Sequence, residues 1–277
     1  MTATTTPVAR PGLGALPRSA GNANFAGALR SEFTKIRSVR STWWTLLVMV
    51  VVTVGIGALS SFGATKQLHH GVQFDPTMRS LAGLYLSQLV IAVLGAMVIT
   101  SEYSTGMIRT SLAVLPRRGM LVAAKAVVFA AVTFVVGLIT SFASFFIGQA
   151  IMSPDHLNAT LSQPGVLRAV IGGALFLTAC GLLAFGVGLL LRHTAGAISL
   201  MVVLLFVVSI LVNFLPSSWQ NNVDKWIPAE AGGQIWTTVP ATGNPPLFAP
   251  WTGFAVLCAY AAIAIAAGMI LFRKRNA

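Results

Sequence analysis

The chain has few charged residues and very few acids. Only 9% of its 277 residues are charged, whereas soluble domains carry about 25%. Hydrophobic residues make up 56% of the sequence and the mean hydropathy is +0.81. A soluble core of this size cannot bury so much apolar surface, so the composition excludes an ordinary soluble domain and predicts an integral membrane protein.

Several catalytic and metal-binding motifs are also missing. The two cysteines, Cys180 and Cys258, lie inside apolar runs, so we predict small packing residues rather than a disulfide or a CxxC metal site. None of the five Lys follows a Gly, which excludes the P-loop of ATPases. The adjacent His69 and His70 would need further ligands to chelate a metal. We therefore predict that the chain is not an enzyme and holds no metal or cofactor of its own.

Six apolar runs are long enough to cross a membrane, which takes about 20 residues. Their centres carry no Asp, Glu, Lys or Arg, which argues against a transporter driven by its own ion coupling and against an enzyme that needs acid/base groups. Small residues in the fourth run (Gly181, Ala184, Gly186, Gly188) and the sixth (Ala264, Gly268) predict close helix packing. We predict an all-α protein with spans near 43–63, 82–101, 121–150, 167–191, 195–214 and 251–272.

Nearly all the basic residues fall on one side of this topology. That side has 14 of them and only two acids, Glu32 and Glu102, whereas the other side has four of each, so one side carries the whole net charge of +12. Basic residues concentrate on the cytoplasmic side of membrane proteins. We therefore predict a cell-membrane protein with both termini in the cytoplasm, and we predict no nucleic-acid partner. The 14 are Arg10, Arg18, Arg30, Lys35, Arg37, Arg40, Arg109, Arg117, Arg118, Lys125, Arg192, Arg273, Lys274 and Arg275.

The segments at the chain ends lie outside the spans. Residues 1–24 are polar and rich in Thr, Pro, Gly and Ala, which predicts a disordered tail, and 273–277 form a short basic tail. Residues 25–42 carry an apolar helical stripe and basic residues off it, which predicts an amphipathic helix in the cytoplasmic interface. This helix either anchors the chain near anionic membrane lipid or docks a cytoplasmic partner. The stripe consists of Phe25, Leu29, Phe33, Ile36 and Val39.

Two further segments interrupt the spans. Residues 215–250 are too rich in Pro for a span, and we expect short helices dipping into the outer leaflet or a cap over a pathway. All six Trp lie in this segment or beside a span end, as expected at a membrane boundary. Residues 102–119, EYSTGMIRTSLAVLPRRG, predict a short cytoplasmic helix that Ser104 or Thr105 caps and Pro116 ends. Its apolar face either binds a partner or lies against the bilayer.

Two stretches resemble the permease subunits of ABC-2 type transporters in their six-span bacterial form. One is LRSEFTKIRSVRSTWWTLL, similar to the family's interfacial helix running into the first span. The other is EYSTGMIRTSLAVLPRRGMLVAAK, similar to the family's pattern of Glu, Gly, an apolar pair, Pro, a basic residue and Lys. Here the matching positions are Glu102, Gly106, Leu112, Pro116, Arg117 and Lys125.

The resemblance implies a function for the whole chain. It would be the membrane-spanning permease subunit of an ATP-driven exporter, with 25–42 as connecting helix, 102–119 as the coupling segment and 215–250 as a re-entrant segment. ATP and Mg²⁺ would bind two copies of a separate ATPase subunit, beside a second permease subunit that is either a copy or a different chain. The implied coupling residues are Glu102, Gly106, Arg109, Leu112, Pro116, Arg117 and Arg118.

If the resemblance is set aside, the sequence leaves two alternative functions open. The chain is then either a membrane scaffold or sensor without transport activity, or a membrane-embedded enzyme acting on lipid-linked substrates. An ATPase partner would exclude the scaffold, and turnover by the isolated chain would favour the enzyme.

Overall fold

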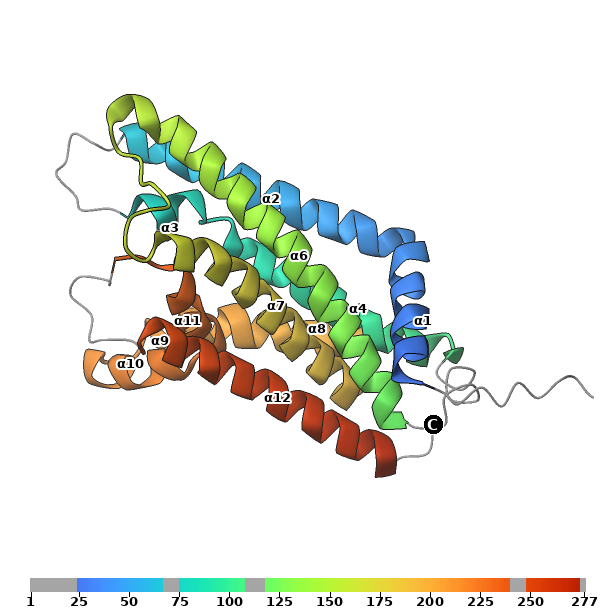
Figure 1. Ribbon diagram of the computed structural model, residues 1–277. Helices are drawn as coiled ribbons and strands as arrows, with labels where there is room; N and C mark the ends of the chain where they lie inside the picture. The colour runs from blue at the N-terminus through green and yellow to red at the C-terminus, as the bar shows by residue number, and fades with distance from the viewer. Residues whose placement is uncertain (1–23, 67–74, 108–117, 240–247, 275–277) are drawn as a thin grey trace, which may run out of the picture.

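The computed structural model describes residues 24–66, 75–107, 118–239 and 248–274, and within these ranges it contains helices and no strand (Figure 1). Six helical stretches are long and apolar enough to cross a membrane. This confirms the predicted all-α membrane fold. They run over Arg40–Lys66, Leu84–Ser104, Gly119–Asp155, Val166–Leu191, Thr194–Val212 and Pro250–Phe272.

The first five long stretches occupy the chain up to residue 212, and short helices separate the fifth from the sixth. The fifth continues through a π-helical turn, η3, between α8 and α9. In chain order the elements are α1 (Phe25–Ser38), α2 (Arg40–Lys66), α3 (Pro76–Ser80), α4 (Leu84–Ser104), α6 (Arg118–Met152), η2 (Ser153–Asp155), α7 (Val166–Leu191), α8 (Thr194–Val202), η3 (Val203–Val207), α9 (Val208–Val212), α10 (Ser217–Val223), η4 (Asp224–Trp226), α11 (Pro228–Gly233), η5 (Gln234–Trp236) and α12 (Pro250–Lys274).

Helix α7 is the central helix, and its neighbours include α4, α6 and α12. Its glycines let these helices approach. A Cβ added at Gly181 would lie 2.9 Å from the Phe129 ring, and one at Gly186 would lie 2.8 Å from the Ala264 Cβ. Because side chains do not tolerate such short contacts, only Gly fits at these positions. The close packing predicted from small residues in the fourth and sixth spans is confirmed.

The two ends of the bundle differ. Helix α1, the last turn of α4, the first turns of α6 and the last turns of α12 lie together at one end, which we name the basic end (Figure 1). Helices α3, α10 and α11 lie at the opposite, far end. The assignment of the basic end to the cytoplasm stays a prediction.

Segment 215–250 folds, where it is described, into the short elements α10, η4, α11 and η5 at the far end. Its Trp236 is only 1% exposed and packs edge-on against Tyr85, with ring centroids 4.9 Å apart. Trp236 is therefore covered by α4 and α7 rather than exposed to lipid, and the prediction that every Trp lies at a membrane boundary stays a prediction. The other five Trp are at least 50% exposed.

Two charged residues hold this far-end segment in place. Asp75 Oδ1 accepts hydrogen bonds from the first turn of α3, and its Oδ2 accepts from the backbone N–H groups of Thr238 and Val239 at 2.8 and 3.0 Å. Arg168 on α7 donates to the Thr237 carbonyl at 2.9 Å. The chain after η5 is therefore tied to both α3 and α7.

Candidate functional site: a buried ion cluster at the basic end

Helix α1 lies across the basic end and meets α2 at an elbow (Figure 1). The break is a single residue, Val39, whose extended backbone (φ −84°, ψ 109°) ends α1. Trp43 of α2 reaches back and donates from Nε1 to the Arg37 carbonyl at 3.1 Å, satisfying one of the carbonyls left open at the end of α1. Lys35 and Arg37 in the last turn also suit the negative end of the helix dipole.

The face of α1 that packs against the bundle differs from the predicted stripe. Ala28, Glu32 and Ile36, spaced four apart, are buried. Of the stripe residues, Phe33 is 52% exposed and Phe25 is 40% exposed. Val39 of the stripe is also exposed and Leu29 is half-buried, whereas Ile36 belongs both to the stripe and to the packed face. The stripe is therefore divided, and its exposed members point away from the protein, as expected of a helix at a membrane surface. The helix also ends at Ser38, earlier than predicted, because α2 begins at Arg40.

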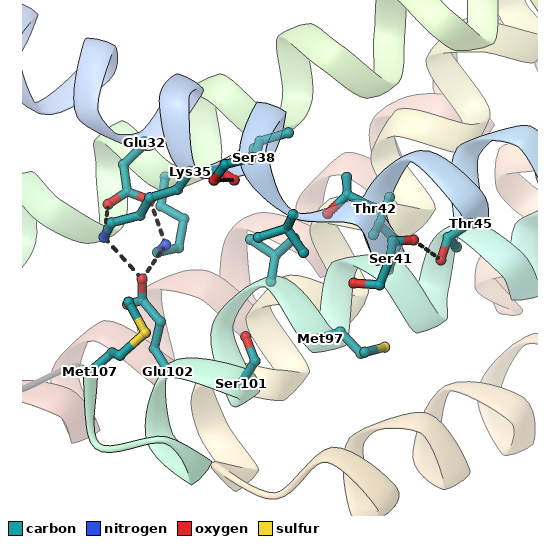
Figure 2. A pocket seen from close by; sticks show the side chains of 15 residues that line it. Glu32, Lys35, Ser38, Ser41, Thr42, Thr45, Met97, Ser101, Glu102 and Met107 are labelled. Atoms are coloured by element: carbon teal, nitrogen blue, oxygen red, sulfur yellow. Dashed lines mark hydrogen bonds and ion pairs between the residues drawn. The ribbon is translucent and has the colours of Figure 1, made fainter.

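Four charged side chains from α1, α4 and α6 meet beneath α1 (Figure 2). Lys125 Nζ lies 2.5 Å from Glu32 Oε2 and 2.8 Å from Glu102 Oε1. Lys35 Nζ lies 2.8 Å from Glu32 Oε1 and 3.1 Å from the same Glu102 oxygen. Two carboxylates and two ammonium groups thus form a closed ring of contacts, which we name the ion cluster.

The ion cluster is buried and has no formal net charge. The side chains of Glu32, Glu102 and Lys125 are 2%, 7% and 4% exposed, and that of Lys35 is 30% exposed. Burial alone would lower the pKa of Lys35, but its hydrogen bond to Glu32 and the charges of both carboxylates outweigh burial and raise that pKa above 10.5. Isolated charges would be very costly in such a setting, so the four groups depend on one another.

One oxygen of the cluster is unsatisfied. Glu102 Oε2 is buried and has no hydrogen-bond partner among the described residues. Beside the cluster lies a cavity of about 230 Å³ beneath the elbow, lined also by the hydroxyl-bearing Ser41, Thr42 and Ser101 (Figure 2). Glu102 is therefore the member of the ion cluster whose hydrogen bonds are incomplete, and it lies next to free volume.

The end of α4 directs the chain toward residues 108–117. Thr105 and Ser104 donate from their hydroxyls back to the Ser101 carbonyl, so they complete the last turn of α4. Gly106 then takes a left-handed backbone conformation, with φ +71°. Glycine adopts this conformation without strain and commonly follows the last residue of a helix. Gly106 therefore stops α4 and turns the chain outward at the basic end.

The structure brings only part of the predicted coupling set into view. Glu102 joins the ion cluster, Gly106 makes the turn, and Arg118 is the first residue of α6. The remaining four lie outside the described residues, so their roles stay predictions. These are Arg109, Leu112, Pro116 and Arg117.

Sequence reasoning missed Glu32 and Lys35 as site residues and placed Lys125 only by its match to the family pattern. A signal was present, because Glu32 and Glu102 are the only acids on the basic side. Two isolated acids among 14 basic residues, each next to a membrane span, are good candidates for paired buried groups.

A further cation at the basic end, outside the ion cluster, is held by aromatic rings. Arg192 links α7 to α8 in a left-handed conformation, with φ 56°. Its guanidinium carbon lies 5.1 Å from the Tyr103 ring centroid and 5.8 Å from that of Phe272. These distances fit cation–π contacts. Arg192 therefore joins the ends of α4, α7 and α12 close to the turn at Gly106.

The described cysteines and potential metal ligands form no second site. Cys180 and Cys258 are free thiols. Among the described residues no group of three His, Cys, Asp or Glu is placed to hold a metal ion. His69 and His70 lie outside the described residues.

Comparison with known proteins identifies one family. The family model described as "ABC-2 family transporter protein" matches residues 28–223 of this chain. The matched range covers well over half of the chain and includes all four members of the ion cluster. A search of curated proteins found no match.

Proposed function

The chain belongs to the ABC-2 transporter family, and we propose that it is the membrane-spanning permease subunit of an ATP-driven exporter. Membership of the family identifies a multi-pass membrane transport component that works with an ABC ATPase, not a catalytic subunit. In our proposal, ATP and Mg²⁺ bind two copies of that ATPase, and two permease subunits, identical or different, form the pathway. The basic end faces the cytoplasm of a cell-membrane protein, with both termini on that side.

The observation that supports the proposal is that the ion cluster joins α4 and α6, the two helices that flank residues 108–117 in the sequence. Glu102 lies shortly before this segment and Lys125 shortly after it, and they contact each other at 2.8 Å. Both also pair with charges on α1. A displacement of 108–117 would therefore reach α4, α6 and α1 together, which is what a coupling element requires.

The predicted coupling residues take distinct roles in this proposal. Leu112 offers an apolar side to a cleft in the ATPase, and Pro116 ends the coupling helix. Arg109, Arg117 and Arg118 pair with acidic groups of the ATPase. Glu102 acts inside the chain, where its contacts with Lys35 and Lys125 pass the movement to α1 and α6.

Reversing the charge of two of these residues tests the proposal. The tagged chain carrying Arg117→Glu and Arg118→Glu is purified from its native membrane, and the stoichiometry and activity of any P-loop ATPase bound to it are measured. We expect the ATPase to dissociate or to lose its dependence on transport substrate. The matched control is Arg273→Glu with Lys274→Glu, which makes the same charge change at the end of α12, outside the proposed contact.

Two results would contradict the proposal. Normal substrate-dependent ATPase activity in the Arg117/Arg118 double variant would remove residues 102–119 from the coupling path. A wild-type chain that purifies without any P-loop ATPase would favour the scaffold or sensor instead.

A further inference from the structure

An apolar groove runs along the outside of the basic end, between α1, the start of α2 and α6. It has a volume of about 560 Å³ and is open on one side. Its floor is the face of α6 from Val127 to Val136, and α1 supplies Leu29 and Phe33 as one wall. Val127 and Phe33 are 50% and 52% exposed, so the groove is an uncovered apolar surface in the chain itself.

The groove has the length of one membrane leaflet. Val127 and Val136 are nine residues apart, which on an α-helix corresponds to about 14 Å. Half of the hydrocarbon core of a bilayer is about 15 Å thick. Trp43, which also lines the groove, is a residue type that marks the membrane–water boundary. An acyl chain entering at α1 would therefore reach the middle of the bilayer at the other end of the groove.

The mouth of the groove is positively charged. Arg30 lines it, and Arg37 lies two turns further along α1 on the same side of the helix. Neither guanidinium takes part in any ion pair among the described residues, since all four such pairs belong to the ion cluster. Both residues are exposed. An anionic group at the mouth would find two cations with no competing partner in this part of the protein.

We propose that this groove binds one anionic phospholipid, with an acyl chain along α6 and its phosphate at Arg30 and Arg37. A second copy of the chain is a poorer occupant, because it would bring its own basic end, with the same excess of cations, against these arginines. The lipid covers the exposed apolar side of α1, which the other helices leave uncovered. It thereby holds α1 where Glu32 and Lys35 complete the ion cluster, and this binding does not depend on the proposed transport function.

Retention of lipid by the purified protein tests the proposal. The protein in mild detergent is stripped of lipid, exposed to equal amounts of phosphatidylglycerol and phosphatidylcholine, and examined by native mass spectrometry. We expect one phosphatidylglycerol to be retained in preference to phosphatidylcholine. One arginine near a membrane surface contributes about 1 kcal/mol, so Arg30→Gln is expected to weaken retention about fivefold.

A second variant blocks the apolar part of the groove. Ala131 lies on its floor and is exposed, so Ala131→Trp fills the groove without entering the core. We expect this variant to lose the bound lipid while keeping both arginines. The matched controls are Lys274→Gln, an exposed cation at the same end, and Ala266→Trp, an exposed position on α12. Both controls should retain phosphatidylglycerol as the wild type does.

Three outcomes would overturn the proposal. Equal retention of the two lipids would show that the head group is not recognised. An equal loss in Lys274→Gln and Arg30→Gln would show that total charge, not the groove, attracts the lipid. If Ala131→Trp splits a dimer and leaves lipid retention unchanged, the groove is covered by a second copy of the chain.

Discussion

Replacing Lys125 by Met tests whether the ion cluster holds α1 to the bundle. The Lys125 side chain is 4% exposed, and its Nζ lies 2.5 Å from Glu32 and 2.8 Å from Glu102. Met keeps the unbranched apolar stem but removes the charge, which leaves two buried carboxylates sharing Lys35 alone. Removing one partner of a buried ion pair typically costs about 3–5 kcal/mol, and we expect a loss of this size in the free energy of unfolding.

Lys35 provides a matched comparison, because it contacts the same two carboxylates. Its side chain is 30% exposed, so water competes for its charge and for the charges that it leaves behind. Ion pairs exposed to solvent contribute about 0–1 kcal/mol. We therefore expect Lys35→Met to lower the free energy of unfolding by about 1 kcal/mol, given this exposure, and by much less than Lys125→Met.

Equilibrium unfolding of the purified chain in mixed detergent micelles, followed by Trp fluorescence, measures both losses. A rescue adds a second criterion. Glu32→Gln removes one carboxylate from the Lys125→Met protein and leaves the Lys35–Glu102 pair, which is neutral. The double variant should therefore be more stable than Lys125→Met alone. Equal losses at the two lysines would refute the argument from the exposure of Lys35, and a further loss on adding Glu32→Gln would refute the idea that the four charges depend on one another.

Two other predictions use the same unfolding measurement. Burial raises the pKa of Glu230 above 4.5, and the nearby charge of Asp224 raises it further. Ionisation of Glu230 therefore costs more in the folded protein than in the unfolded chain, so stability falls as the pH rises from 4.5 through the folded-state pKa. Glu230→Gln should therefore stabilise the protein near neutral pH but not below pH 4.5; no stabilisation at neutral pH would contradict this. Gly95→Ala would place its Cβ against the Gly181 carbonyl oxygen between α4 and α7, whereas Gly63→Ala meets nothing within 4 Å. We expect Gly95→Ala to lower the free energy of unfolding markedly and Gly63→Ala to raise it by about 0.5–1 kcal/mol. Similar effects of the two substitutions would contradict the close packing of α4 against α7.

The long helices could be predicted because each apolar run exceeds what a membrane crossing needs. The fourth span was expected at 167–191, and α7 runs from Val166 to Leu191. Helix α2 contains the span predicted near 43–63 and extends beyond it on both sides, from Arg40 to Lys66. Hydropathy locates the part of a helix that lipid surrounds, whereas the helix itself continues into polar residues on either side.

The orientation of α1 could not be read from its apolar stripe. In a soluble protein the apolar side of a helix faces the core, but a helix at a membrane surface has lipid as a second apolar environment. Here Phe25, Phe33 and Val39 of the stripe face outward, and the packed side contains Glu32 between Ala28 and Ile36, the one stripe residue that is buried. Besides the local Lys35, Glu32 pairs with the buried Lys125, which lies 93 residues away in the sequence. No local pattern reports such a pairing, because it depends on how α1 crosses α6.

The ion cluster is better explained as a device that fixes the relative positions of three helices than as a source of stability. A buried set of ion pairs is often no more stable than apolar residues of similar size, because desolvation offsets most of the attraction. Helix α1 leaves Phe25, Phe33 and Val39 exposed and has only a narrow packed side, so apolar contacts alone would let it slide along α6. Charges that must meet within about 3 Å allow one register only. The cluster therefore fixes α1, α4 and α6 relative to one another at the two points where the chain enters and leaves residues 108–117. If residues 108–117 contact the ATPase as we propose, a lock of this kind would pass their displacement to all three helices, where a purely apolar contact would absorb it.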